Sequence, residues 1–177
     1  MLDVAYPLAR AVLFSLDAET AHHLTFRALS AAPRLFGSVA RLTMGPPDPS
    51  LAREVAGLKF AGPVGLAAGL DKDGVAIPFW PSLGFGFIEI GTVTAHPQEG
   101  NPKPRMFRLV DEGAIINRMG FNNRGSADLA ARMRLLRQAG QWPSIPVGVN
   151  IGKSKITPLN EATGDYVTST QRLEGLA

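Results

Sequence analysis

The sequence has no cysteine among its 177 residues, and this absence removes several kinds of chemistry. Disulfide bonds, thiolate metal sites, iron–sulfur clusters and cysteine nucleophiles are all excluded. Any redox activity must therefore use a bound cofactor. The three histidines, His22, His23 and His96, show no metal-ligand spacing, because adjacent residues such as His22 and His23 point to different faces of a helix. We expect no metal site.

Long hydrophobic runs and blocks of like charge are also missing. No stretch approaches the roughly 18 uncharged apolar residues of a membrane-spanning helix. The first residues include Asp3 and Pro7, where an export signal would be basic and then apolar. The formal charge of +3 is spread along the chain, which gives little support to nucleic-acid binding. We expect an intracellular protein with no spanning segment, no export signal and no nucleic-acid partner.

The chain has the composition of a globular protein, with 45% hydrophobic and 19% charged residues. Its length suits one domain but falls short of the roughly 250 residues of a complete eight-unit α/β barrel. Three prolines within Pro46–Pro49 forbid a helix and favour an extended connector. We therefore divide the chain into a helical region over 1–44, a linker over 45–53 and an α/β region over 54–177.

The region before the connector has helical periodicity. Leu8, Val12 and Leu16 recur every fourth residue after Pro7, which suits a first helical turn. Asp17 is a candidate N-cap for a second helix that ends before Pro33. A third segment places apolar residues on one side, namely Leu35, Phe36, Val39 and Leu42. These short amphipathic helices either pack on their own domain or lie on a membrane surface, and periodicity does not distinguish the two.

After the connector, short apolar segments rich in glycine and β-branched residues alternate with helix-like stretches, which is the pattern of an α/β fold. We expect one arm of a hairpin over 55–60, and strands over 64–69, 87–93 and 147–151. Helices are expected over 74–83, 126–139 and 165–176. The interval 95–123 shows no clear helix, so it is either a functional loop or has local strands of its own.

Polar residues follow each expected strand of the parallel sheet. They are Asp71 and Lys72 after the first strand, Thr92 and Thr94 at the second, and Asn150 and Lys153 at the third. The carboxyl ends of parallel strands line one rim in α/β folds, so we expect these side chains to converge on an active site. The alternative for any single residue is that a polar side chain simply marks the end of a strand.

Lys72 and the segment 117–123 favour a neutral or anionic heterocyclic ligand. Lys72 follows a run of Ala, Gly and Leu that should be buried, and its ammonium is suited to a carboxylate or a flavin ring oxygen. The segment 117–123 is rich in amides, which both donate and accept hydrogen bonds. The alternatives are a surface lysine beside an aspartate, and a turn that leads into the helix near Ser126.

Five segments resemble the dihydroorotate dehydrogenase family, in the order and spacing of that family. They are GLAAGLDKDG (65–74), GFGFIEIGTVT (84–94), NPKPRMFRL (101–109), INRMGFNNRG (116–125) and VNIGKSK (149–155). The leading helices, with LDAETAHHLTF over 16–26, resemble the quinone-linked, membrane-associated class (class 2). The resemblance covers essentially the whole chain. It implies the N-terminal part of a (β/α)8 TIM barrel, preceded by a short helical membrane-associated arm.

The resemblance also implies a function, namely FMN-dependent oxidation of dihydroorotate to orotate in de novo pyrimidine (UMP) biosynthesis, with a membrane quinone as electron acceptor. Flavin-contacting positions of the family fall on Ala68, Gly69, Leu70, Asp71, Lys72, Thr92 and Asn150. Substrate-binding positions fall on Lys72, Asn117, Arg118, Met119, Gly120 and Phe121. Positions that line the quinone tunnel fall on His22 and Arg108. We expect a peripheral membrane protein on the cytoplasmic face of a bacterial inner membrane.

In the quinone-linked class, a base removes a proton next to a carbonyl while hydride passes from the adjacent carbon to the flavin. That base is a serine in the second half of the family's barrel. No catalytic residue therefore maps onto this sequence, and the base is expected beyond Ala177. We expect a fragment of the enzyme. Two alternatives stay open, namely a truncated product without catalysis and a different TIM-barrel flavin oxidoreductase. The first would be excluded if the chain bound FMN and dihydroorotate reduced that FMN.

Overall fold

A computed structural model describes residues 2–45 and 47–177, apart from the side chains of residues 2–6 and 8. Pro46 and the side chain of Leu8, which entered the predictions above, lie outside the described residues. The chain begins with three helices, α1 (Leu2–Phe14), α2 (Ala18–Ala31) and α3 (Pro33–Met44). Asp17 is the N-cap of α2, as predicted, since its carboxylate accepts the amide N–H groups of Glu19 and Thr20 at 3.1 and 3.0 Å.

The connector leads through a short 3₁₀ helix, η1 (Pro49–Leu51), into a hairpin of β1 (Arg53–Val55) and β2 (Leu58–Phe60). The expectation of a single arm over 55–60 was wrong, because both arms lie within residues 53–60. The chain reverses at Ala56 and Gly57, whose φ angles are +52° and +78°. Two successive residues with positive φ form the turn that joins two antiparallel strands most tightly.

A three-stranded parallel sheet forms the centre of the molecule, in the order β3–β4–β7. Strands β4 (Phe87–Val93) and β7 (Val147–Ile151) match their predicted ranges. Strand β3 (Gly65–Leu66) is shorter than the predicted 64–69. It pairs only with the first two residues of β4, and the chain then turns away near Gly69, whose φ is +113°. The remainder of that segment is therefore a loop.

The predicted helix over 74–83 is also wrong. This stretch consists of turns that end in the 3₁₀ helix η2 (Trp80–Leu83). Gly74 has a φ of +64°, and Pro78 and Pro81 lack the amide hydrogens that a continuous helix requires. The carboxylate of Asp71 stabilises the first of these turns, since it accepts the amide N–H groups of Val75 and Ala76 at 2.8 and 2.9 Å.

The interval 95–123 has no helix in the described structure and contains an antiparallel pair, β5 (Met106–Leu109) and β6 (Ala114–Asn117). Helix α4 (Ser126–Gln138) matches its predicted range to one residue. The last helix, α5 (Ala162–Leu173), begins and ends three residues earlier than predicted and follows the 3₁₀ helix η3 (Leu159–Glu161). Gly175, with a φ of +69°, lies just beyond its end.

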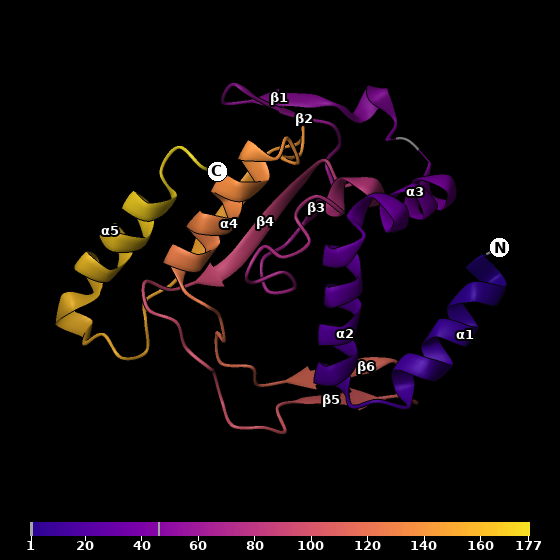
Figure 1. Ribbon diagram of the computed structural model, residues 1–177, viewed down its shortest axis with the longest axis horizontal. Helices are drawn as coiled ribbons and strands as arrows, with labels where there is room; N and C mark the ends of the chain where they lie inside the picture. The colour runs from indigo at the N-terminus through magenta and orange to yellow at the C-terminus, as the bar shows by residue number, and fades with distance from the viewer. Residues whose placement is uncertain (1, 46) are drawn as a thin grey trace.

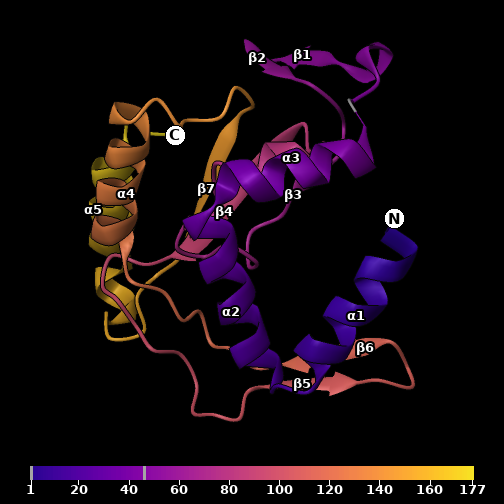
Figure 2. The same cartoon turned by 45° about the vertical axis from the view of Figure 1, so that its right-hand side comes forward.

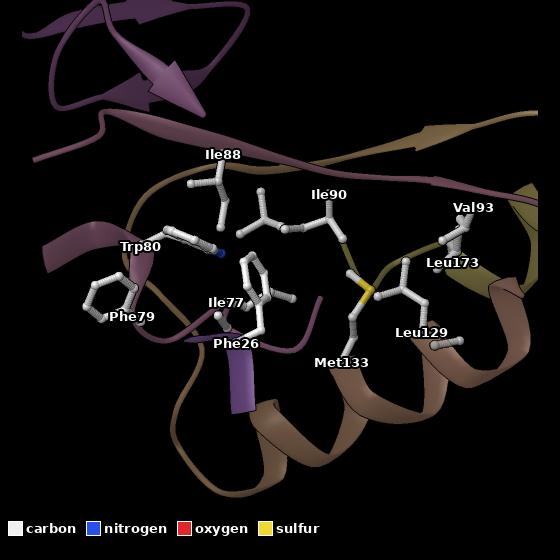
Figure 3. Close-up of a cluster of buried hydrophobic side chains, with 13 residues drawn as sticks. Phe26, Ile77, Phe79, Trp80, Ile88, Ile90, Val93, Leu129, Met133 and Leu173 are labelled. Atoms are coloured by element: carbon white, nitrogen blue, oxygen red, sulfur yellow. The ribbon is translucent and has the colours of Figure 1, made fainter. Parts of the chain in front are cut away.

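Helices α4 and α5 lie side by side against the sheet, while α2 and α3 approach it from the other end, as Figures 1 and 2 show. The core lies between the sheet and α4. Ile88 and Ile90 on β4 meet Leu129 and Met133 on α4, and Phe26 of α2 reaches the same cluster (Figure 3). Side chains alternate along a strand, so Glu89 lies on the face of β4 opposite Ile88 and Ile90. The register of β4 against β7 shifts between Ile90 and Val93, so that Val93 also enters the core and Thr92 joins Glu89 and Asn150 on the opposite face.

Among the described residues, no helix combines the length and the apolar character that crossing a membrane would require.

Candidate functional site

A cavity of about 990 Å³ lies between α2, the loop after β3, the end of β4 and the segment after β6. It has the size of a pocket for a small organic ligand or cofactor. Most of the residues predicted from the sequence line it, namely His22, Ala68, Gly69, Leu70, Asp71, Lys72, Thr92, Asn117, Met119, Gly120 and Phe121. The fold therefore brings together segments that lie almost 100 residues apart in the chain.

Lys72 places a positive charge in this cavity, which Arg27, Arg124 and Arg132 also line. Its ammonium is half-buried and donates to the side-chain carbonyl oxygen of Asn122 at 2.6 Å. Burial lowers the pKa of Lys72 below its ordinary value, and the neighbouring Arg105 adds to that effect. Asn122 was part of the amide-rich segment in the sequence, but its pairing with Lys72 is visible only in three dimensions.

The end of β4 meets the end of β7 through a chain of polar side chains. The Thr92 hydroxyl donates to the Asn150 side-chain oxygen at 2.5 Å, and the Asn150 amide donates to the Glu89 carboxylate at 3.2 Å. Asn150 contacts the cavity wall through Thr92 rather than lining the cavity itself. Sequence reasoning did not select Glu89, because a single acid inside a strand gives no signal of its own.

The segment after β6 is held in place by Asn123. The backbone of Asn123 pairs with that of Gln98 in both directions at 2.9 Å. The buried Asn123 side chain accepts the backbone amides of Thr94 and Gly125 and donates to the carbonyl of Phe121 at 2.7 Å. Buried polar groups satisfied in this way rigidify a loop. The predicted substrate segment therefore has a defined geometry, with Phe121 at a φ of +55°.

Two predicted residues direct their side chains to other parts of the protein. The Asp71 carboxylate is 1% exposed and accepts the Trp80 indole N–H at 2.9 Å, besides the amides that it caps. Burial raises the pKa of Asp71. The Arg118 guanidinium donates to the carbonyl of Pro104 at 3.0 Å and is exposed. Asp71 therefore stabilises the loop that carries Lys72, and Arg118 holds its own segment against the loop before β5.

The two residues predicted for a quinone tunnel are separated. The His22 ring lies in the cavity and packs on Phe26, with ring centroids 4.3 Å apart. Burial lowers the pKa of His22. The Arg108 guanidinium does not line this cavity. It donates to the carbonyls of Leu16 and Leu13 at 2.7 and 3.2 Å and stacks on the Phe14 ring.

Ala177, beyond which the catalytic base was expected, lies away from this cavity. It is exposed, follows the end of α5 and does not line the cavity. The described residues therefore do not test the expectation of a serine base beyond Ala177, which stays a prediction.

A buried ion pair joins the helical arm to the loop before β5, and sequence reasoning missed it. The Arg105 guanidinium donates to the Glu19 carboxylate at 2.6 Å, and both side chains are under 10% exposed. Arg105 holds the pKa of Glu19 at about 2. An acid at this position, in the first turn of a helix, indicates by itself only a favourable interaction with the helix dipole. A pair 86 residues apart leaves no local pattern from which it could be predicted.

Among the side chains that the structure describes, His, Asp and Glu do not gather into any group of three or more suited to a metal ion.

Comparison with known proteins identifies the family of this chain. The sequence model of the family described as dihydroorotate dehydrogenase matches residues 50–177. A dihydroorotate dehydrogenase (quinone) of Mycobacterium tuberculosis is 51% identical over 174 residues, which cover 97% of this chain and 47% of that protein. One from Chloroflexus aurantiacus is 55% identical over 170 residues, covering 93% of this chain and 46% of its own. The chain thus spans about half the length of these relatives.

Solved structures lead to the same family. The dihydroorotate dehydrogenase of Eimeria tenella, in complex with ferulenol, superimposes with a TM-score of 0.77 at 36% identity. That match covers 94% of this chain and 45% of the other. The ligand-free form of the Eimeria tenella protein gives a TM-score of 0.67 at 38% identity, over 83% of this chain and 42% of the other. The chain therefore belongs to the dihydroorotate dehydrogenase family, with quinone-linked enzymes among its relatives.

Proposed function

We propose that residues 1–177 form the N-terminal part of a quinone-linked dihydroorotate dehydrogenase, an enzyme of de novo pyrimidine biosynthesis. The observation that carries this proposal is the cavity in which Lys72, Thr92 and the segment 117–121 meet beneath His22 of α2. The three-stranded sheet is then the first part of an eight-stranded barrel. The base, proposed to be a serine, lies beyond Ala177, so the residues described here bind and orient the substrate.

The residues of this cavity fit the ring system of FMN. At Gly69 the φ is +113° and the space where a Cβ would stand is open, so the backbone can approach a flat ring closely. Lys72 provides a cation and Thr92 a hydroxyl in the cavity, and Asn150 supports Thr92 from behind by accepting its hydroxyl hydrogen bond. We propose that these residues hold the flavin on one flank. When bound, FMN supplies the hydride acceptor.

The same cavity suits dihydroorotate, which has a carboxylate and ring carbonyl and N–H groups. Lys72 would bind the carboxylate, because an ammonium with unused donors is directed at the cavity. Asn117, Met119, Gly120 and Phe121 line the cavity too. Asn123 keeps this segment rigid, so little conformational entropy is lost on binding.

Titrating the purified chain with FMN and then with orotate tests this proposal. Lys72→Ala should weaken the binding of both, since one cation faces both ligands, whereas Lys155→Ala on the exposed surface should change neither. Bound flavin is measured by its absorbance spectrum, and its reduction by dihydroorotate is then followed. If the wild-type chain binds neither ligand, residues 1–177 alone are not a binding unit and a truncated product without catalysis becomes the better description.

We further propose that the three leading helices lie on the cytoplasmic face of a bacterial inner membrane and admit a quinone towards His22. What supports this is the row of apolar side chains that α3 exposes, since Leu35, Val39 and Leu42 are 64, 54 and 86% exposed. A helix of this kind buries its apolar face in the interface between headgroups and acyl chains. His22 and Phe26 of α2, which belongs to the same arm, line the cavity.

Flotation with phospholipid vesicles tests the membrane proposal. The double variant Leu35→Asp and Leu42→Asp should abolish the co-flotation expected of the wild type, because each charge must then leave water. A matched pair of substitutions on the hairpin, Val55→Asp and Leu58→Asp, should leave flotation unchanged. These side chains are a suitable control because they are also apolar and exposed, at 60 and 53%. Equal losses in the two double variants would show that binding is nonspecific and contradict a membrane-facing arm.

A further inference from the structure

We propose that Asn122 is a positioning residue for Lys72, whose ammonium it orients in the cavity while leaving the positive charge available to an anionic ligand. The family resemblance assigned the segment only as far as Phe121. The inference rests on the proposed function in one respect, namely that the anionic ligand is the carboxylate of dihydroorotate or orotate.

Lys72 is unusual because its hydrogen-bond partner carries no charge. In the part of the chain that the structure describes, no carboxylate lies within the 4.0 Å of an ion pair from the Lys72 ammonium. Its hydrogen bond goes to the neutral side chain of Asn122 at 2.6 Å. A lysine ammonium has three donors, so two remain for a ligand. Because lysine can only donate, the oxygen of the Asn122 amide must face it.

A neutral acceptor and a carboxylate would act differently at this position. An amide oxygen fixes the direction of the ammonium through one hydrogen bond and adds no negative charge to those of Asp73 and Glu19, which act on Lys72 from beyond ion-pair distance. A carboxylate in the same place would neutralise the charge and compete with an anionic ligand. The pair is half-buried, where the remaining charge acts more strongly on a ligand than it would in water.

The two residues that follow Asn122 are both held in place. The backbone of Asn123 pairs with Gln98, and the amide of Arg124 donates to the Asp73 carboxylate at 2.8 Å. Two cross-links therefore join the segments 71–73 and 122–124 in parallel, the first from Lys72 to Asn122 and the second from Asp73 to Arg124. This arrangement keeps the Asn122 oxygen at the place where Lys72 meets the cavity.

Competitive acetylation of the five lysines, followed residue by residue with mass spectrometry as the pH is raised, tests the proposal in the full chain. Asn122→Asp preserves the shape of the side chain and adds a negative charge. It should raise the apparent pKa of Lys72 by about one unit and slow its labelling roughly tenfold at neutral pH. Asn122→Ala removes an acceptor from the charged form, so it should lower that pKa and speed the labelling.

Two references make the result specific to Lys72. Lys153, whose ammonium donates to the carbonyls of Ser154 and Thr157, should keep its labelling rate in both variants. Asn160→Asp, on the exposed 3₁₀ helix η3, adds the same charge elsewhere and should leave Lys72 unchanged. An unaltered Lys72 rate in Asn122→Asp would overturn the proposal. Equal acceleration of all five lysines in that isosteric variant would do so too, since it would assign Asn122 a purely structural role.

Adding orotate separates this proposal from the proposed function. Opposite shifts of the Lys72 rate in the two variants, without protection of Lys72 by orotate in the wild type, would support the positioning role and remove the proposed substrate. Protection that is equal in the wild type and both variants, with no shift of the Lys72 rate, would keep the substrate and overturn the positioning role. Opposite shifts together with protection that weakens in Asn122→Asp are the expected result.

Discussion

Glu19 shows how much a single buried residue contributes to this structure. Its carboxylate lies against Arg105, which also donates to the carbonyl of Asn101 at 2.9 Å. Lys103 approaches the same carboxylate at 3.4 Å, but the Lys103 side chain is 65% exposed. Removing one member of a buried ion pair leaves the other uncompensated, whereas an exposed pair contributes little. The contacts of Glu19 with Arg105 and with Lys103 should therefore contribute very different amounts to the free energy of unfolding.

We predict that Glu19→Gln lowers the free energy of unfolding by about 3 kcal/mol at neutral pH, because Arg105 then lacks its counter-charge. Lys103→Gln, which removes only the exposed contact, should cost less than about 1 kcal/mol. Urea unfolding, followed by tryptophan fluorescence, measures both. Equal effects of the two substitutions would mean that burial does not distinguish these contacts.

The same pair should make stability depend on pH. The folded pKa of Glu19 is about 2, below the roughly 4.3 of an unfolded glutamate. The contribution of Glu19 is therefore complete above the unfolded value and is lost as the pH falls through the folded value. The difference in unfolding free energy between wild type and Glu19→Gln should stay constant above about pH 5 and shrink between about pH 4 and 2. A difference that grew with acidity would contradict the assigned pair.

Among the elements, the start of β4 depends on a close approach of two backbones. A Cβ on Gly86 would overlap the carbonyl oxygen of Gly62, and the amide of Gly86 donates to the carbonyl of Val64 at 2.8 Å. Gly148 in β7 is different, since the nearest atoms to a Cβ there are 3.9 Å away. The two glycines thus look alike in the sequence but differ in what surrounds them.

We predict that Gly86→Ala costs about 2 kcal/mol of stability, because backbone atoms must move to admit the methyl group. Gly148→Ala should stay within about 0.5 kcal/mol of the wild type. Thermal or urea unfolding of the two variants provides the measurement. A Gly148→Ala variant as unstable as Gly86→Ala would indicate that loss of glycine flexibility, and not the contact with Gly62, governs the effect.

On the scale of the whole molecule, the helical arm and the sheet are joined at few places. Phe26 of α2 reaches the central core, whereas α1 lies at the edge of the molecule beside β5 and β6 (Figure 2). Arg108 on β5 connects α1 to the remainder by binding the carbonyls at its C-terminal end. Among the side chains of α1 that the structure describes, none is buried, so we expect this helix to open locally before the rest unfolds.

We predict that Arg108→Ala increases hydrogen exchange in α1 by several-fold and leaves α4 and β4 unchanged. The reason is that the carbonyls of Leu13 and Leu16 lose their donor and Phe14 loses one of the two guanidinium groups that stack on it. Arg10→Ala removes the other guanidinium and serves as the control, with a smaller effect expected. Hydrogen exchange measured by mass spectrometry resolves these segments. Unchanged exchange in α1 would show that Arg108 does not secure the arm.

Local patterns were sufficient for several elements. The N-cap at Asp17, strands over 87–93 and 147–151 and the helix from Ser126 each depend on neighbours in the sequence. The failures have two causes. The length of β3 is set by its pairing with β4, a contact between distant parts of the chain. The turns after Gly74 have a local cause, since Gly74 adopts a positive φ and Pro78 and Pro81 lack amide hydrogens, and the nearby Asp71 carboxylate holds the turns.

The candidate site divides in the same way. The sequence alone determined the chemical types at the carboxyl ends of the strands, and it determined family membership, because Lys72 and the amide-rich segment belong to continuous motifs. Only the tertiary structure decided that Asn122 orients Lys72, that Arg105 pairs with Glu19, and that Arg108 turns to α1 and away from His22. The physical reason is that a hydrogen bond or ion pair acts over a few ångströms of space. Residues 50 to 90 positions apart come within that distance only when the chain has folded.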